Sequence, residues 1–151
     1  MKSRIFMGLL ICLQLLSPSL FAKEVQKPSK LPVSVVFKSG QTIDFKNLMI
    51  GYADSSLFGS SSFKSLDSLP LKTPDLSFEI PLKNLVKIEF ISSKKLVDGT
   101  DVSVKLTDRK GKILEGSVVS EKSLQWRSIY DFADSEVILD PDKMKEINIK
   151  H

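Results

Sequence analysis

Apolar and polar residues alternate along most of the chain with a period of two, which is typical of half-buried β-strands. A first run at residues 33–37 is followed by a turn at residues 38–41 and a returning run that starts at Ile43. Gly40 suits this turn because glycine adopts positive φ without steric cost. The alternation changes phase near residues 46–47, which predicts a β-bulge. No long stretch has the 3.6-residue period of an amphipathic helix, so the pattern predicts an all-β fold.

The same order of features occurs twice, which predicts two tandem β-units at residues 33–91 and 102–150. Each unit reads as a strand, a glycine turn, a second strand, a variable segment, a proline turn and a last strand. Val33 aligns with Val102 at an offset of 69 residues and Ile43 with Leu114 at an offset of 71, so the glycine turn of the second unit is expected to be two residues longer. The last strands align at an offset of 59 residues. Because any two β-meanders look alike once gaps are allowed, chance similarity is the alternative to duplication.

The segments outside these strands are expected to be connections. Residues 23–32 are polar and read as a flexible lead-in. Residues 53–76 form a long Ser-rich loop within the first unit, although the loop also holds apolar residues that need something to cover them. Residues 92–101 read as a polar linker. The two units are expected to pack into one compact body, since a domain of about 50–60 residues is marginally stable alone.

The first 22 residues have the organisation of a secretory signal peptide. Lys2 and Arg4 precede an apolar run at residues 5–16, which is too short to span a bilayer, and Ala22 offers a small residue for cleavage. We therefore expect an exported protein, periplasmic or at the cell surface, with no transmembrane span in the mature chain. An uncleaved membrane anchor is the alternative.

Charge and cysteine content narrow the class of protein. The chain has 22 basic and 18 acidic residues, and the signal segment contains two of the basic ones, so the mature chain is almost balanced. The overall basicity of the chain is therefore not a signature of nucleic-acid binding, which requires positive charge clustered on one face. The one cysteine, Cys12, lies in the signal segment, so the mature chain has no disulfide and depends on its core for stability.

The two units resemble the small SH3-like or Sm-like β-module of exported bacterial envelope proteins. The resemblance rests on the segment SFEIPLKNLVKIEF at residues 77–90 and on the strand, turn and closing-strand order of residues 102–149. It implies a five-stranded barrel for each unit. It implies no particular activity, because such barrels have many unrelated functions.

The sequence offers little for catalysis, metal binding or a cofactor. The only histidine, His151, is the last residue, which argues against histidine-dependent triads and zinc sites, so no catalytic residue, metal ligand or cofactor is assigned. Ser61-x-x-Lys64 and Ser92-x-x-Lys95 match a Ser/Lys nucleophile pattern by composition alone. Acidic residues gather at residues 131–142, where calcium binding is weighed against a simple turn cap at Asp140.

Aromatic residues are the better candidates for binding, because flat rings give contact area at small entropic cost. Trp126, Tyr130 and Phe132 fall around a predicted hairpin of the second unit, although Trp126 alternates with Leu124 as a core residue would. Phe58 and Phe63 lie in the Ser-rich loop, and their alternative role is packing on the protein's own body.

Together these features predict a non-enzymatic binding or scaffold protein of the bacterial cell envelope. Its expected partner is an envelope protein or a cell-wall glycan, and no nucleic acid. The alternative is a small periplasmic hydrolase that uses Ser/Lys or paired carboxylates.

Overall fold

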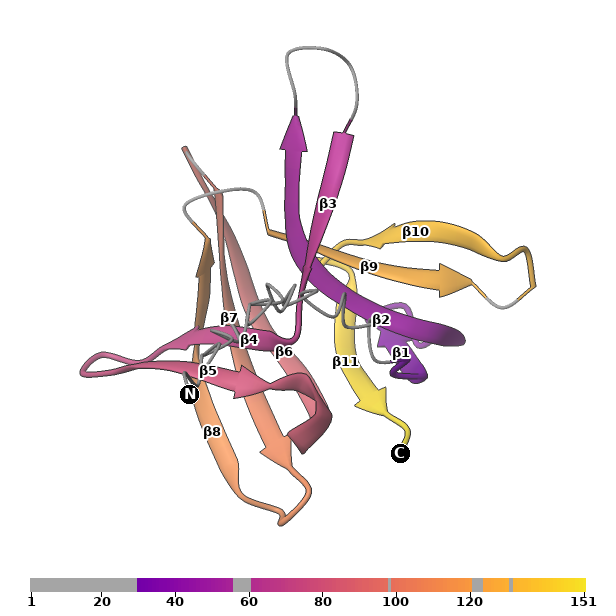
Figure 1. Ribbon diagram of the computed structural model, residues 1–151. Coiled ribbons are helices and arrows are strands. Elements are labelled where there is room, and N and C mark those ends of the chain that lie inside the picture. The colour runs from indigo at the N-terminus through magenta and orange to yellow at the C-terminus, as the bar shows by residue number, and fades with distance from the viewer. Residues whose placement is uncertain (1–29, 56–60, 98, 121–123, 131) are drawn as a thin grey trace, which may run out of the picture.

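The computed structural model describes residues 30–55, 61–97, 99–120, 124–130 and 132–151, and the all-β prediction is confirmed for this part of the chain. Its strands form one curled sheet (Figure 1). The elements are β1 (Val33–Phe37), β2 (Thr42–Ser55), β3 (Ser61–Leu66), β4 (Ser68–Lys72), β5 (Ser77–Pro81), the 3-10 turn η1 (Leu82–Asn84), β6 (Leu85–Leu96), β7 (Gly99–Asp108), β8 (Ile113–Ser120), β9 (Leu124–Tyr130), β10 (Ser135–Leu139) and β11 (Met144–Ile149).

The strands do not group as two consecutive units. The sheet order is β10-β9-β2-β1-β11-β6-β7-β8-β4-β5, with β3 paired to β2. One half of the sheet therefore combines β1 and β2 with β9, β10 and β11, and we name it the terminal module. The other half combines β4, β5 and β6 with β7 and β8, and we name it the central module. Figure 1 shows this exchange in colour, because indigo strands lie with yellow ones and magenta strands with orange ones.

A tight hairpin explains the exchange. The segment at residues 92–101, expected to be a linker, instead continues β6 to Leu96 and starts β7 at Gly99, and these two residues pair with each other. β7 must therefore lie antiparallel beside β6, the last strand of the first unit. The first strand of the second unit, β7, thus pairs with the last strand of the first unit. The last strand of the second unit, β11, pairs with β1 instead.

The two modules have matching strand registers. At the seam between them, Ile88 of β6 pairs with Ile147 of β11, and these residues occupy equivalent places in the two sequence units. Ile147 also pairs with Val35 of β1, as Ile88 pairs with Leu106 of β7. The register of the β1–β11 ladder shifts between Val36 and Phe37, and that of the β6–β7 ladder shifts between Leu85 and Lys87. These two shifts occupy equivalent places relative to the Ile88–Ile147 pair. The strand order and the registers on the two sides of the seam therefore correspond.

These registers correct the sequence alignment of the first hairpins. Val35 pairs with Ile43 and Leu106 pairs with Leu114, so both strands of the hairpin align at an offset of 71 residues. Val33 therefore corresponds to Val104, and not to Val102. The glycine turns have equal length, and Gly40 and Gly111 adopt positive φ of 87° and 76°.

Two other connections are ordered structure. In the predicted loop at residues 53–76, β3 and β4 form hairpins with β2 and β5, while residues 56–60 lie outside the described part. At the end of the predicted lead-in, the buried Leu31 donates its N–H to Asn47 Oδ1 at 2.9 Å and accepts from Leu48 N at 2.9 Å. The predicted bulge is confirmed, because the β2–β9 register shifts between Phe45 and Asn47.

The core lies inside the curl of the sheet, where alternate strand residues point inward. Trp126 of β9 is 1% exposed and lies edge-on to Phe90 of β6, with ring centroids 5.1 Å apart. This contact joins the terminal module to the central module. Burial of a ring of this size is among the larger single contributions to stability in such a core.

The seam also carries a titratable group, Glu146. A hydrogen bond from Asn148 Nδ2 at 3.1 Å and the ammonium of Lys87 at 3.4 Å hold the pKa of Glu146 below its ordinary value of 4.5, against the opposing effect of burial. A carboxyl whose folded pKa is lowered contributes stability that is present above its unfolded pKa and lost as the pH falls through its folded pKa. We expect the melting temperature to fall below about pH 4.5.

Thermal melts by circular dichroism at about pH 6 and about pH 3 test this expectation. Glu146→Gln should have the smaller fall in melting temperature, because it cannot lose this charge. The exposed Glu115→Gln variant is the control and should behave as the parent. Equal pH dependence in both variants would contradict the role of Glu146.

Candidate functional site

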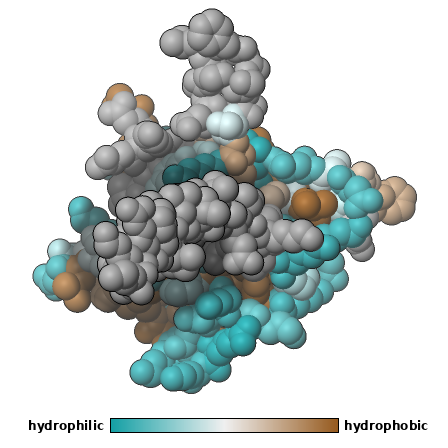
Figure 2. Space-filling model, viewed as in Figure 1, coloured by the Kyte–Doolittle hydropathy of each residue, from teal (hydrophilic) through white to brown (hydrophobic). Residues whose placement is uncertain are grey.

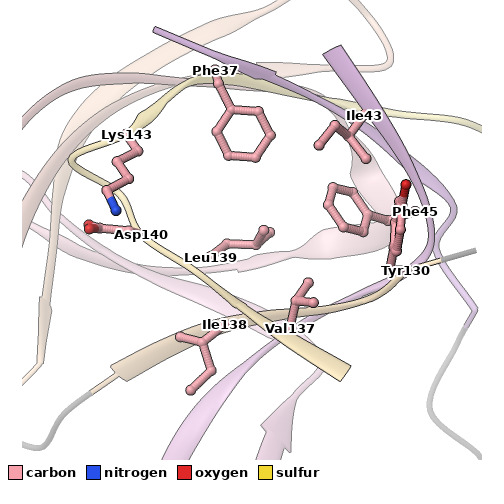
Figure 3. Close-up of a pocket in the computed structure, with 9 residues that line it drawn as sticks. All are labelled: Phe37, Ile43, Phe45, Tyr130, Val137, Ile138, Leu139, Asp140 and Lys143. Atoms are coloured by element: carbon pink, nitrogen blue, oxygen red, sulfur yellow. The ribbon is translucent and has the colours of Figure 1, made fainter. Parts of the chain in front are cut away.

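An apolar groove opens in the terminal module between the β1–β2 hairpin, the β9–β10 hairpin and the turn before β11 (Figure 3). Its volume is about 310 Å³, and an adjoining opening of about 390 Å³ shares Phe37, Ile43 and Lys143 with it. Figure 3 shows Phe37 and Ile43 on one side of the groove and Val137 and Leu139 on the other. The groove can hold an apolar side chain of a ligand.

The alternation of β1 and β2 builds one wall. Val35 pairs with Ile43 and Val33 with Phe45, so the side chains of odd-numbered residues lie on the same face of this hairpin. Phe45 is buried at the floor, and its ring lies 5.9 Å from that of Tyr130 at the end of β9.

β10 and the following turn build the opposite wall. Val137 pairs with Ser128 and Leu139 with Trp126, which aims the two aliphatic side chains inward. Asp140 then closes the turn, because its carboxylate accepts from Asp142 N at 3.0 Å and its carbonyl accepts from Lys143 N at 3.0 Å. The prediction that Asp140 caps this turn is confirmed.

The central module has different residues at the equivalent places. Asp108 stands where the terminal module has Phe37, and its carboxylate accepts from the backbone N–H groups of Lys110 and Lys112, both at 2.8 Å. Gly116 stands where the terminal module has Phe45. A Cβ at Gly116 would lie 2.7 Å from the carbonyl oxygen of Lys72, so no larger residue fits there without movement of the backbone. The aromatic lining is therefore specific to the terminal module.

The structure separates the five aromatic residues that the sequence singled out. Tyr130 lines the groove. Phe132, in the turn after β9, is 92% exposed. Trp126 is buried, so its proposed role in ligand contact is wrong and the core alternative holds. Phe63 of β3 is partly buried beneath the guanidinium of Arg127, which lies 4.2 Å from the ring centroid. Phe58 lies outside the described residues.

Sequence reasoning missed Phe37, Ile43 and Val137 as lining residues. Their alternation predicts an inward face, and nothing local distinguishes an inward residue that is covered from one that lines an opening. It also missed Arg127, which hydrogen-bonds Gln125 Oε1 through Nε at 2.9 Å and pairs with Glu136. Because the same guanidinium also lies over the ring of Phe63, Arg127 links β3 to the β9–β10 hairpin.

The remaining candidate groups do not converge. Ser92 and Lys95 lie three residues apart on a regular part of β6, and therefore on opposite faces of the sheet. In the acidic segment, Asp134 pairs with Lys46 at 2.5 Å and Glu136 with Arg127. Over the part of the chain that the structure describes, no group of His, Cys, Asp or Glu residues is placed to hold a metal ion.

No protein-family model, curated protein or solved structure is significantly similar to this chain. In the described ranges, no helix has the length and hydropathy needed to cross a membrane. The site is therefore interpreted from its own geometry.

Proposed function

We propose that this chain is an exported, non-enzymatic binding protein of the bacterial cell envelope, and that it holds an apolar side chain of a partner protein in the groove of the terminal module. The main support for this proposal is the aromatic and aliphatic lining of the groove, in which Phe37, Ile43 and Tyr130 are partly exposed on an otherwise buried face. Binding sites typically combine such apolar walls with a few polar groups at the rim. Here the rim holds Asp140 and Lys143.

A protein partner is favoured over a glycan by the scarcity of polar groups. A sugar in a groove needs hydrogen-bond partners for its hydroxyl groups, because an unpaired polar group loses its hydrogen bonds to water. An aliphatic or aromatic side chain has no such requirement, and its burial is favourable by about 25 cal/mol per Å².

The fold supports the same proposal. Each module has five strands, and the turn before β11 has its counterpart in η1 before β6. This arrangement supports the SH3-like interpretation of the units. The matched registers favour an origin by duplication. We propose that, after duplication, the terminal module, whose strands come from both units, kept an open groove and that the central module became its support. We do not propose the hydrolase, because Ser92 and Lys95 lie on opposite faces of β6, and because Asp134 and Glu136 pair with Lys46 and Arg127.

Selection from a phage-displayed library of random peptides tests the proposal. Selected peptides are expected to share an apolar anchor residue, and Phe37→Asp is expected to weaken their binding by at least about tenfold. Asp is the residue at the equivalent turn of the central module, where it accepts two backbone hydrogen bonds, so the fold should tolerate it.

A matched pair of variants separates the groove from general stability. Ile43→Thr and Leu114→Thr change equivalent, half-buried positions of the two hairpins. Only Ile43→Thr should weaken peptide binding, as measured by calorimetry. Equal binding to both variants, or the selection of peptides without an apolar anchor, would overturn the proposed site.

A further inference from the structure

We infer that the β7–β8 turn and the adjacent η1 turn form a cationic patch that binds the surface of an anionic lipid bilayer. The patch consists of Lys83 in η1 and of Arg109, Lys110 and Lys112 in the β7–β8 turn, and all four side chains are exposed. The two turns are joined by a hydrogen bond from Arg109 N to the carbonyl of Asn84 at 3.0 Å. Figure 2 shows a hydrophilic projection at the lower end of the molecule, where Figure 1 places the β7–β8 turn.

The positive charges of this patch are not used within the protein. Among the described residues, no ion pair joins any of the four cations to a carboxylate. Asp108, the nearest acidic residue in sequence, directs its carboxylate to the backbone N–H groups of the turn. The guanidinium of Arg109 contacts the neighbouring His151 Nδ1 at 2.5 Å. The patch therefore keeps a net positive charge toward solvent.

The cations are also not needed to form the turn. The equivalent turn of the terminal module has the same backbone–backbone hydrogen bonds, with Lys38 N bonded to the carbonyl of Lys143 at 2.9 Å and with Gly40 at positive φ. It carries Lys38, Ser39 and Gln41 at the positions of Arg109, Lys110 and Lys112. Because one backbone accepts both sets of residues, turn geometry does not explain the three cations.

An exposed apolar residue beside the cations favours a bilayer as the ligand. Ile113 follows Lys112 and is 59% exposed, whereas the terminal module has Thr42 at this position. A lipid interface accepts an apolar side chain among cations that bind anionic headgroups. A nucleic acid would gain little from Ile113, and the turn offers no aromatic ring for base stacking. Charge and shape thus fit a broad anionic surface.

Sedimentation with lipid vesicles tests the inference. Every strand pair that the structure describes lies within residues 30–151, so a chain that starts at Lys23 keeps all of these pairs and lacks the apolar N-terminal segment. We expect it to sediment with vesicles that contain about 30% phosphatidylglycerol, and not with pure phosphatidylcholine vesicles. Binding should weaken as NaCl is raised from about 0.05 M to about 0.5 M.

The turn of the terminal module supplies the test variant. Arg109→Lys, Lys110→Ser and Lys112→Gln together remove two charges and should lower vesicle binding about 30-fold with an unchanged melting temperature. Lys94→Gln with Lys95→Gln removes the same charge from the exposed β6–β7 hairpin and should leave binding nearly unchanged. Ile113→Thr should weaken binding without altering its salt dependence.

Three results would overturn the inference. The parent chain could fail to bind anionic vesicles, or both charge variants could lose binding equally, which would indicate net charge alone. Binding to single-stranded DNA or polyglutamate without binding to vesicles would assign the patch to an acidic macromolecule. The inference is independent of the groove, since Phe37→Asp should leave vesicle binding intact.

Discussion

Cutting the chain between residues 97 and 98 is expected to give two fragments that fold only together. The amino-terminal fragment keeps the pairs β1–β2, β2–β3 and β4–β5, and the carboxy-terminal fragment keeps β7–β8 and β9–β10. All other strand pairs that the structure describes cross between the fragments, namely β1–β11, β2–β9, β4–β8, β6–β7 and β6–β11. Because isolated two-stranded hairpins are marginal in water, each fragment alone should be largely unfolded.

Mixing the two fragments tests this expectation. Trp126 lies in the carboxy-terminal fragment and its ring partner Phe90 in the other, so tryptophan fluorescence should shift to shorter wavelength on mixing and saturate at a ratio of one to one. Circular dichroism should show a cooperative melt only for the mixture. The control is the full chain cleaved at the same turn after folding. A monomeric fragment that melts cooperatively by itself would show that each unit closes its own barrel.

Replacement of Trp126 by Ala is expected to lower the free energy of unfolding by about 3–5 kcal/mol. The side chain is 1% exposed, and its loss would leave a cavity between Phe90 and the strands around β9. Small domains have a total stability of about 5–15 kcal/mol, so the variant should be partly unfolded at moderate temperature.

Urea denaturation followed by circular dichroism measures this effect, since the variant has no tryptophan to report by fluorescence. Phe132→Ala is the matched control, because this aromatic side chain is 92% exposed in the turn after the same strand and its loss should change stability by less than about 0.5 kcal/mol. A comparable small loss for Trp126→Ala would show that the ring does not lie in the core.

Local features of the strands could be predicted from the sequence. The inward alternation of β1 and β7, the glycine turns, the bulge near Phe45 and the cap at Asp140 all depend on residues close together in the chain. A period of two reports which face a residue occupies, and it contains no information about which strand lies alongside. The alternation could therefore not predict that strands of the two units pair with each other.

One local sequence feature does indicate the hairpin between β6 and β7. The dipeptide Asp98-Gly99 is typical of tight hairpins, and it lies within the segment at residues 92–101 that was expected to be a polar linker. Polar residues in strands exposed on both faces, such as Lys94 and Lys95, hide the alternation on which strand prediction depends. The groove was missed for a related reason, because its lining residues follow the same alternation as the core.

The pairing of the first and last strands has a mechanical consequence. Val33 pairs with Ile149, and Lys150 N donates to the carbonyl of Pro32 at 2.8 Å, so the two ends of the folded chain leave the sheet side by side. Tension applied between these ends loads the β1–β11 ladder at its last rung and opens its hydrogen bonds one after another. The protein should therefore peel apart at low force when it is held by its two ends.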